Sequence, residues 1–341
     1  MPTAHQLPSG SWRVQVRING ARRSVTGPTR RAAELAADDL IRGAAAPASA
    51  LKGSVADAVR RYIDDKSSIL SPSTLRAYQS ALDSYFTPSP FGQIKLSVLT
   101  NAHIQQFINR LSADHSPKSV RNIYGLLTAS LKYSRPDLKI TVQLPAPRRS
   151  EISIPDNKQI PQLLSRCSHY PQLQLSVILA ATCGLRLSEI CALTWDDIDL
   201  KSSTLTITKA LVRGPEGYTL KQPKSRAGYR TVIIPPTTAD YLRALPHDAP
   251  TLITVTPRAI SAAFENVRDS LHLHCRFHDL RHYYASVLLA LGVPNKYAMS
   301  MMGHSTEYTL QHVYQHLMPS RQKEIDSAVG SHFSALLPSK K

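Results

Sequence analysis

A histidine and an arginine three residues apart, at the start of an apolar run, most constrain how this chain folds. Residues 277–282 read Phe-His-Asp-Leu-Arg-His and precede an apolar run over 285–291, which predicts a buried helix. Residues at i and i+3 share one helix face, so His278 and Arg281 are expected to point toward the same place. An imidazole transfers protons, and a guanidinium stays charged and donates parallel hydrogen bonds. The pair therefore suits a phosphate whose ester bond is exchanged.

Further short motifs accompany this pair in a fixed order along the chain. They are Cys-Gly-Leu-Arg-Leu-Ser-Glu-Ile over 183–190, Pro-Lys-Ser at Lys224, Met-Gly-His-Ser at His304 and Val-Tyr-Gln-His at Tyr314. The apolar run over 173–181 stops at Gly184, which predicts a helix end, with Arg186 at the mouth of the next helix. Lys224 lies between strand-like alternations over 205–208 and 231–234, so we expect it on a flexible hairpin.

The order Arg, Lys, His-x-x-Arg, Gly-His and Tyr-x-His resembles the catalytic domain of the tyrosine recombinases, the phage-integrase family. The resemblance implies a multidomain protein, mainly α with small β-sheets. Its expected parts are a three-stranded sheet plus helix that binds arm-type DNA over 1–45, a four-helix core-binding domain over 53–140, and an α+β catalytic domain with a C-terminal tail over 152–336.

The chemistry of phosphodiester exchange assigns a role to each motif. Arg186 and Arg281 can neutralise the phosphate oxygens, each donor to developing charge contributing on the order of 3–4 kcal/mol. Tyr314 is the expected nucleophile, a phenol with an ordinary pKa of about 10 that needs nearby cations and a proton acceptor. Lys224 can protonate the leaving 5′-oxygen.

The resemblance adds the remaining roles. It implies that Tyr314 forms a 3′-phosphotyrosyl link, that His278 and His304 share proton transfer and phosphate hydrogen bonding, and that Glu189 orients an arginine or histidine. No metal and no cofactor are expected in this scheme.

Each residue taken singly has another interpretation. Arg186 could cap a helix, Lys224 could belong to a solvated hairpin, and Tyr308 competes with Tyr314 as nucleophile, although only Tyr314 has the Tyr-x-His context. The spacing of His274, His278 and His282 around Cys275 also permits a zinc site, but Cys-x-x-Cys and His-Glu-x-x-His patterns are both missing.

Positive charge is spread over the whole chain. Lys and Arg number 41 against 24 Asp and Glu, giving a formal charge of +17. The basic excess is 8 against 3 residues over 1–52, 13 against 6 over 53–150 and 20 against 15 over 151–341. Such a distribution is typical of a protein that contacts phosphates along its length. The four cysteines have no regular spacing and are expected to be reduced core residues.

The N-terminal residues predict a small sheet with one basic face. Residues 12–18 alternate apolar and basic side chains, Asn19-Gly20 is a hairpin turn signal, and residues 22–26 form the returning strand. A helix capped by Thr29 follows, with an apolar stripe, and residues 43–50 are expected to be a linker. Candidate DNA contacts on this segment are Arg13, Arg17 and Arg22, unless the module is a basic appendage that binds no DNA.

Residues 53–135 have the rhythm of four helices, with starts expected near Val55, Ser73, Thr100 and Ser116. The resemblance implies that this unit clamps DNA opposite the catalytic domain, with residues 145–149 as linker. Further candidate contacts near helix starts are Arg76, Lys118 and Arg121, for which a solvated surface role is equally consistent with the sequence.

We therefore expect a site-specific DNA recombinase, an integrase of a phage or mobile element. A resolvase or invertase of the same family and a catalytically silent DNA-binding regulator are the alternatives. The expected partners are double-stranded DNA with specific core and arm sites, further copies of the chain in a tetramer, and accessory bending or excision factors. No membrane segment is apparent, so a cytoplasmic, nucleoid-associated location in a bacterial host is expected. The amphipathic pattern over 319–336 predicts a last helix that docks on its own or a neighbouring protomer.

Overall fold

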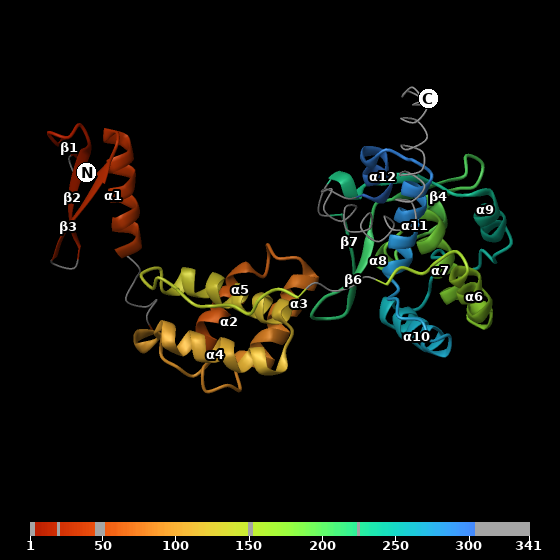
Figure 1. Cartoon of the computed structure of the whole chain (residues 1–341), viewed down its shortest axis with the longest axis horizontal. Coiled ribbons are helices and arrows are strands. Elements are labelled where there is room, and N and C mark those ends of the chain that lie inside the picture. Colours follow the sequence, from red (N-terminus) through yellow and green to blue (C-terminus); the bar gives the residue numbers. More distant parts are fainter. Residues whose placement is uncertain (1–3, 19–20, 45–51, 149–152, 224–225, 304–341) are drawn as a thin grey trace, which may run out of the picture. The chain divides into compact units, whose positions relative to one another are not determined.

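The chain forms two compact units, Met1–Arg149 and Ser150–Lys341. The computed structural model describes residues 4–18, 21–44, 52–148, 153–223 and 226–303 (Figure 1). Helices predominate over small antiparallel sheets, which confirms the expected fold class. No helix in these described ranges is long and apolar enough to cross a membrane.

A three-stranded antiparallel sheet and one helix form the N-terminal part, as the family resemblance implies, whereas the alternation itself predicted only its second and third strands. Their order is β1 (Ala4–Gln6), β2 (Trp12–Ile18), β3 (Ala21–Gly27) and α1 (Arg30–Ala44). Val14 and Val16 on β2 are buried with Ala33 and Ala37 of α1, so the apolar strand face packs on the helix (Figure 1). Because α1 continues through Gly43, the prediction that a linker begins there was wrong.

Four helices follow, and short polar side chains begin each of them. They are α2 (Val55–Lys66), α3 (Pro72–Ala81), α4 (Asn101–Asp114) and α5 (Pro117–Ser134), capped by Ser54, Ser71, Thr100 and Ser116. The second helix begins at Pro72 instead of Ser73, because the Ser71 hydroxyl accepts the N–H of Thr74 and proline fits the first helical position.

The helical part closes on an apolar core with an aromatic centre. A π-helical turn, η1 (Leu82–Phe86), continues α3, and a 3-10 turn, η2 (Leu96–Val98), precedes α4. The Phe91 and Phe107 rings stack with centroids 4.2 Å apart, and Phe86 packs beside them. Aromatic burial of this kind fixes how α4 meets the turn after η1.

The second unit surrounds the buried helix α7 (Pro171–Cys183), which packs against α11 (Asp279–Ala290). Its other helices are α6 (Gln159–Arg166), α8 (Leu187–Ile190), α9 (Pro236–Arg243), α10 (Pro257–Ser270) and α12 (Asn295–Met302), with 3-10 turns η3 (Cys167–His169), η4 (Trp195–Asp197) and η5 (Arg226–Gly228). The apolar run predicted to be a buried helix is helical up to Ala290 and largely buried up to Leu289, whereas Ala290 and Leu291 are exposed. All four cysteines are buried and unpaired, as expected.

Two small sheets complete this unit. Strands β4 (Ile198–Asp199), β5 (Thr204–Ile207) and β8 (Arg230–Ile233) form one antiparallel sheet in that order, and β6 (Ala210–Arg213) pairs with β7 (Tyr218–Lys221) in a separate hairpin. The strands predicted on either side of residue 224 are therefore β5 and β8, but the hairpin β6–β7 between them was not predicted. Position 224 follows β7 in the sequence and lies outside the described residues.

Candidate active site

Arg186 and Glu189 occupy the start of α8. The α7 helix ends at Gly184, whose φ of +66° is favourable only for glycine, and the chain then turns into α8 with Arg186 at the N-cap. The Arg186 backbone N–H donates to Glu189 Oε2 at 2.9 Å, and its Nη1 donates to Oε1 at 2.7 Å. The Arg186 side chain keeps 34% of its surface exposed, so it is a charge that a ligand can reach.

Arg281 lies on the first turn of α11 and is almost completely buried, at 1% exposure. Its Nη1 donates to the Gly184 carbonyl and its Nη2 to the Met302 carbonyl, while the Nε has no partner among the described residues. Burial and the positive charge of Arg186 lower the pKa of Arg281 to about 9, which still leaves it protonated at neutral pH. Arg281 is therefore a fixed, buried cation whose Nε has no acceptor among the described residues.

Arg230, at the first position of β8, is a third arginine in this site that the sequence interpretation missed. Its Nη2 donates to Glu189 Oε2 at 2.7 Å, its Nη1 to Oε1 at 3.2 Å and its Nε to the Met301 carbonyl at 3.0 Å. In the sequence it is one of several basic residues on an expected solvated hairpin. Its side chain is only 4% exposed, so Arg230 is a buried residue of the site and not part of a solvated hairpin. This burial depends on tertiary packing, which the sequence pattern does not show.

The three arginines converge on the C-terminal end of α12. Arg230 donates to the carbonyl of Met301, Arg281 to that of Met302, and Arg186 to that of Gly303 at 3.2 Å. Helix ends present unpaired carbonyls and a partial negative charge, so cations are favourable there. The hydrogen bonds from the three arginines therefore fix the position of residues 301–303.

Among the described residues, Glu189 is the carboxylate that meets all three arginines. It lies at 2.7 Å from Arg186 and Arg230 and at 3.9 Å from Arg281. Burial by itself raises the pKa of Glu189, but the hydrogen bonds and charge of Arg230, together with Arg186, bring it down to about 2. Three positive charges surround one negative charge, and the excess favours binding of an anion.

His278 is the N-cap residue of α11 and lies at the exposed edge of this cluster. Desolvation of its ring lowers the pKa to about 4, and the nearby His282, Arg281 and Arg186 act in the same direction. The His278 and His282 rings meet edge to face with centroids 5.0 Å apart, and the buried Nδ1 of His282 has no partner among the described residues. The His278 imidazole is therefore neutral at pH 7 before any anion binds, and a neutral imidazole can accept a proton.

The structure brings four of the predicted residues together, namely Arg186, Glu189, His278 and Arg281. Lys224, His304, Tyr314 and the predicted helix over 319–336 lie outside the described residues. Over the described ranges, no group of three His, Cys, Asp or Glu side chains is placed to hold a metal ion, including the residues around His278.

The N-terminal sheet presents three of its arginines on the face away from α1, whereas Arg23 pairs with Val16 on the other face. Arg13, Arg17 and Arg22 are exposed, and Arg17 lies directly opposite Arg22 in the β2–β3 register. This arrangement suits a phosphate contact.

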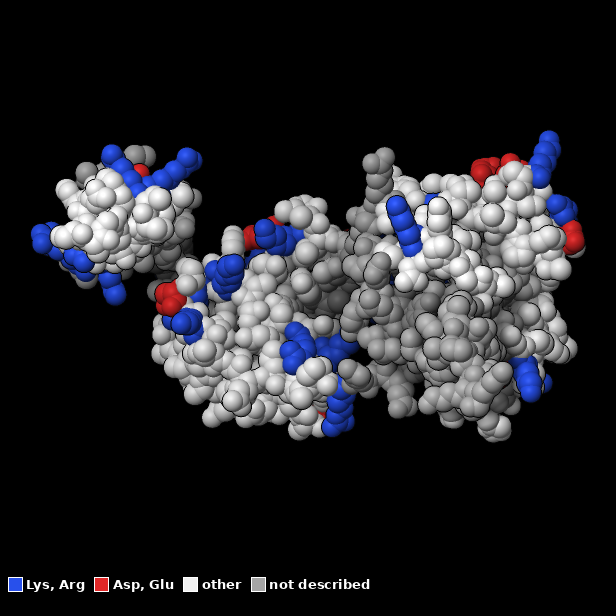
Figure 2. Space-filling model, turned by 45° about the horizontal axis from the view of Figure 1, so that its top comes forward, with Lys and Arg blue, Asp and Glu red and all other residues white. Residues whose placement is uncertain are grey.

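The candidate contacts on the helical part differ from one another. Arg76 and Lys118 are exposed on α3 and α5, while the Arg121 Nη2 donates to the Pro145 carbonyl at 2.9 Å. Arg121 therefore also fastens the segment that follows α5. Figure 2 shows that Lys and Arg outnumber Asp and Glu on the displayed face of this part.

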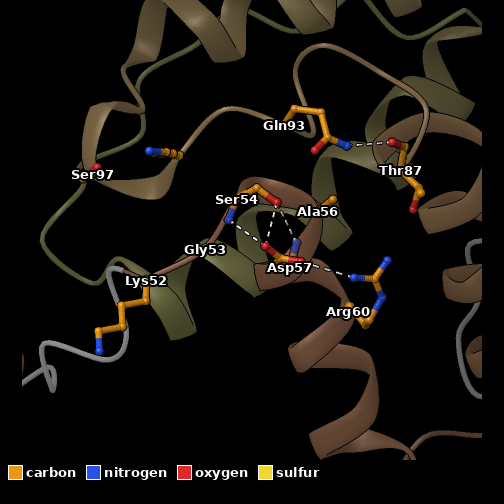
Figure 3. A pocket seen from close by; sticks show the side chains of 10 residues that line it. Lys52, Gly53, Ser54, Ala56, Asp57, Arg60, Thr87, Gln93 and Ser97 are labelled. Carbon is orange, nitrogen blue, oxygen red and sulfur yellow. Dashed lines mark hydrogen bonds and ion pairs between the residues drawn. The ribbon is translucent and has the colours of Figure 1, made fainter.

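A cavity of about 640 Å³ opens beside the start of α2, with Lys52, Arg60 and Lys95 among its lining residues (Figure 3). The Asp57 carboxylate already accepts the Ser54 N–H at 2.9 Å and pairs with Arg60 at 3.2 Å. Because the helix start is satisfied by this carboxylate, we assign no anion site to the cavity.

Comparisons with known proteins agree with this arrangement. Residues 155–321 match the phage integrase family and residues 55–112 match the phage integrase N-terminal SAM-like domain. The prophage phiRv2 integrase of Mycobacterium tuberculosis is 31% identical over 172 residues, which cover 45% of this chain and 44% of that protein. The chain thus matches less than half the length of that relative.

Other similar proteins align over more of the chain. A XerC-like tyrosine recombinase of Caldanaerobacter subterraneus is 23% identical over 74% of this chain and 76% of its own length. Among solved structures, a Tn1549 transposon integrase in complex with circular intermediate DNA has a TM-score of 0.67 at 18% identity, covering 76% of this chain and 94% of that one. A lambda integrase tetramer bound to a Holliday junction has a TM-score of 0.58 at 19% identity, covering 92% and 94%. These likenesses show a shared fold.

Proposed function

Since the chain belongs to the phage integrase family, we propose that it is a tyrosine site-specific recombinase acting as an integrase on DNA. The observation that carries the proposal is the cluster of Arg186, Arg230 and Arg281 around Glu189, with the neutral His278 at its edge. Such a cluster holds a phosphodiester anion and its developing charge without redox or nucleotide chemistry.

The reaction exchanges one phosphate ester for another. The Tyr314 oxygen attacks the phosphorus, a 3′-phosphotyrosyl bond forms, and the bond to the 5′-oxygen breaks. The phenolic proton passes to a base, for which His278 and His304 are the candidates, and Lys224 gives a proton to the departing 5′-oxygen. The 5′-hydroxyl of another strand then attacks the phosphotyrosine and restores Tyr314. Arg186, which is partly exposed, contacts the phosphate oxygens in both steps, and the buried charge of Arg281 stabilises their negative charge.

The remaining parts of the chain bind DNA in this proposal. The sheet with Arg13, Arg17 and Arg22 binds arm sites, and the four-helix part binds the core site. The similar lambda integrase forms a tetramer on a Holliday junction, which supports the same assembly for this chain. Accessory bending or excision factors and a location at the bacterial nucleoid complete the proposal.

A covalent adduct tests the proposed activity. The core site is first found by footprinting the DNA that flanks the gene, and a nicked suicide substrate is built from it. Wild-type protein should give an SDS-resistant protein–DNA complex, and Tyr314→Phe should bind the same DNA yet give none, because only the nucleophilic oxygen is lost.

Tyr308→Phe is the matched control, and it should still form the complex. Peptide mapping should place the DNA on Tyr314. An adduct on Tyr308, or one that persists in Tyr314→Phe, would refute this mechanism.

A further inference from the structure

We infer that Arg230 is a positioning residue for strand cleavage, acting through Glu189 on Arg186 and through the Met301 carbonyl on the end of α12. The inference rests on the proposed function and assigns a role to a residue outside the five motifs of the sequence. Arg230 bonds both oxygens of Glu189 and the Met301 carbonyl, so it joins α8, β8 and α12.

The first step of the argument concerns Arg186. Its guanidinium is partly exposed and is held through Nη1 by Glu189 Oε1 and through Nη2 by the Gly303 carbonyl. Glu189 in turn is oriented by the two Nη atoms of Arg230, which donate to its two oxygens. Without Arg230, Glu189 would keep its hydrogen bonds to Arg186 but lose the bonds that tie its carboxylate to β8, so the orientation of the Arg186 guanidinium would be less tightly fixed.

The second step concerns the chain just before residue 304. Gly303 has a φ of +62°, and a Cβ there would lie 2.7 Å from the Ala227 carbonyl and 3.0 Å from Arg230 Nη1. Arg230 also contacts the Gly228 carbonyl at 3.4 Å, within the segment that links β7 to β8. Its guanidinium therefore packs between the end of α12 and η5.

The third step concerns the burial of the Arg230 side chain, which determines what its guanidinium can contact. Arg230 has a side-chain exposure of 4%, and a buried charge must be paired and hydrogen-bonded to be tolerated. All three of its nitrogens have acceptors in the described residues. Because the guanidinium is buried and each of its nitrogens already donates to a protein acceptor, we assign Arg230 no direct contact with the phosphate.

The test separates DNA binding from cleavage with the nicked suicide substrate. Single-turnover rates of covalent-complex formation are measured at increasing protein concentration for wild type, Arg230→Lys and Arg230→Gln. Lysine keeps the charge beside Glu189 but cannot reach both carboxylate oxygens and the Met301 carbonyl at once. We expect the rate at saturating protein to fall about 10- to 100-fold in Arg230→Lys, and further in Arg230→Gln, while half-saturation changes less than about threefold.

A double mutant tests whether Arg230 affects cleavage through Glu189. If Arg230 acts through Glu189, adding Glu189→Gln to Arg230→Gln should slow cleavage far less than the product of the two single effects. Arg243→Gln, at a surface arginine paired with Asp240 on α9, is the matched control and should cleave at the wild-type rate. Circular dichroism and the midpoint of urea unfolding identify any variant that fails to fold. If Arg230→Gln fails to fold, the cleavage rate of Arg230→Lys tests the inference.

The outcomes distinguish this inference from the proposed function. If the wild-type protein cleaves and Arg230→Lys forms the covalent complex at the same rate at saturating protein, the inference about Arg230 is overturned and the proposed function stands. A loss of binding that matches the loss of rate, or multiplicative effects in the double mutant, also overturns the inference. No covalent complex with the wild-type protein would refute the proposed function, and the role of Arg230 with it.

Discussion

Glu189 stays ionised at a depth where burial alone would favour its neutral form. Its pKa of about 2 results from Arg230 and Arg186, which outweigh desolvation. A carboxylate whose pKa is lower in the folded than in the unfolded chain stabilises the fold above its unfolded pKa, near 4.5. That stability is lost as the pH falls through the interval down to about 2.

The pH dependence of unfolding should follow this sign. Glu189 is expected to contribute on the order of 3 kcal/mol at neutral pH, most of which is lost by pH 3. Glu189→Gln should cost about 3–5 kcal/mol at pH 7, because Arg230 is left as a buried charge without its carboxylate, and should weaken the acid dependence. Urea unfolding at pH 7 and pH 3 measures both effects.

Fluorescence of Trp195 can report this unit alone in a Trp12→Phe background, because the chain has two tryptophans. Glu216→Gln, at the exposed tip between β6 and β7, is the control and should leave both midpoints unchanged. Equal acid dependence in Glu189→Gln and wild type would contradict the assignment.

Sequence reasoning found Arg186, Glu189, His278 and Arg281 because they occur in local patterns at helix starts. Arg230 has no such local pattern. Its partner Glu189 is 41 residues away in the sequence. The sequence around a buried arginine does not differ from that around an exposed one. What identifies it is tertiary packing, which spacing along the chain does not encode.

At the scale of elements, the end of α7 positions the arginines. Gly184 has a positive φ, its carbonyl accepts from Arg281, and a Cβ at this position would lie 2.3 Å from the Tyr284 ring. Tyr284 is itself buried on α11. The glycine therefore permits both the turn into α8 and the close approach of α7 to α11.

Gly184→Ala should destabilise the second unit by on the order of 2–4 kcal/mol, combining left-handed backbone strain with overpacking. Urea unfolding followed by Trp195 fluorescence measures the loss. Gly292→Ala is the matched control, since Gly292 has a φ of +75° but nothing within 4 Å of an added Cβ. It should lose only the strain component, and equal losses in the two variants would exclude the Tyr284 clash.

The elements themselves were predictable to different degrees. Helix starts were found to within about one residue, because Ser54, Ser71, Thr100 and Ser116 cap them locally. The β6–β7 hairpin was not predicted, since its strands are only four residues long and show little alternation of burial. Short strands of this kind are set by the partner with which they pair.

At the scale of the whole molecule, we expect that the N-terminal sheet is not needed for DNA cleavage at the core site. Deleting residues 1–45 should leave covalent-complex formation at the core site intact but abolish footprints on distal arm sites. The slope of log K against log salt should shrink by about 3 if Arg13, Arg17 and Arg22 each contact a phosphate. Footprinting and salt titration check both expectations.

Arg13→Gln, Arg17→Gln and Arg22→Gln combined in the full chain serve as the matched variant, and they should reproduce the loss of arm footprints without removing the module. Arm footprints that survive the deletion would show that these residues do not bind arm DNA.

The convergence of three arginines on the last turn of α12 also has a consequence for biosynthesis. The cluster joins Gly184, Glu189, Arg230, Arg281 and Gly303, so it closes loops that span most of the second unit. Contacts this distant in sequence form late, after the entropy of chain closure has been overcome. A nascent chain with α12 not yet released from the ribosome therefore lacks the three carbonyls on which Arg186, Arg230 and Arg281 converge, so the arginine cluster is completed only late in synthesis.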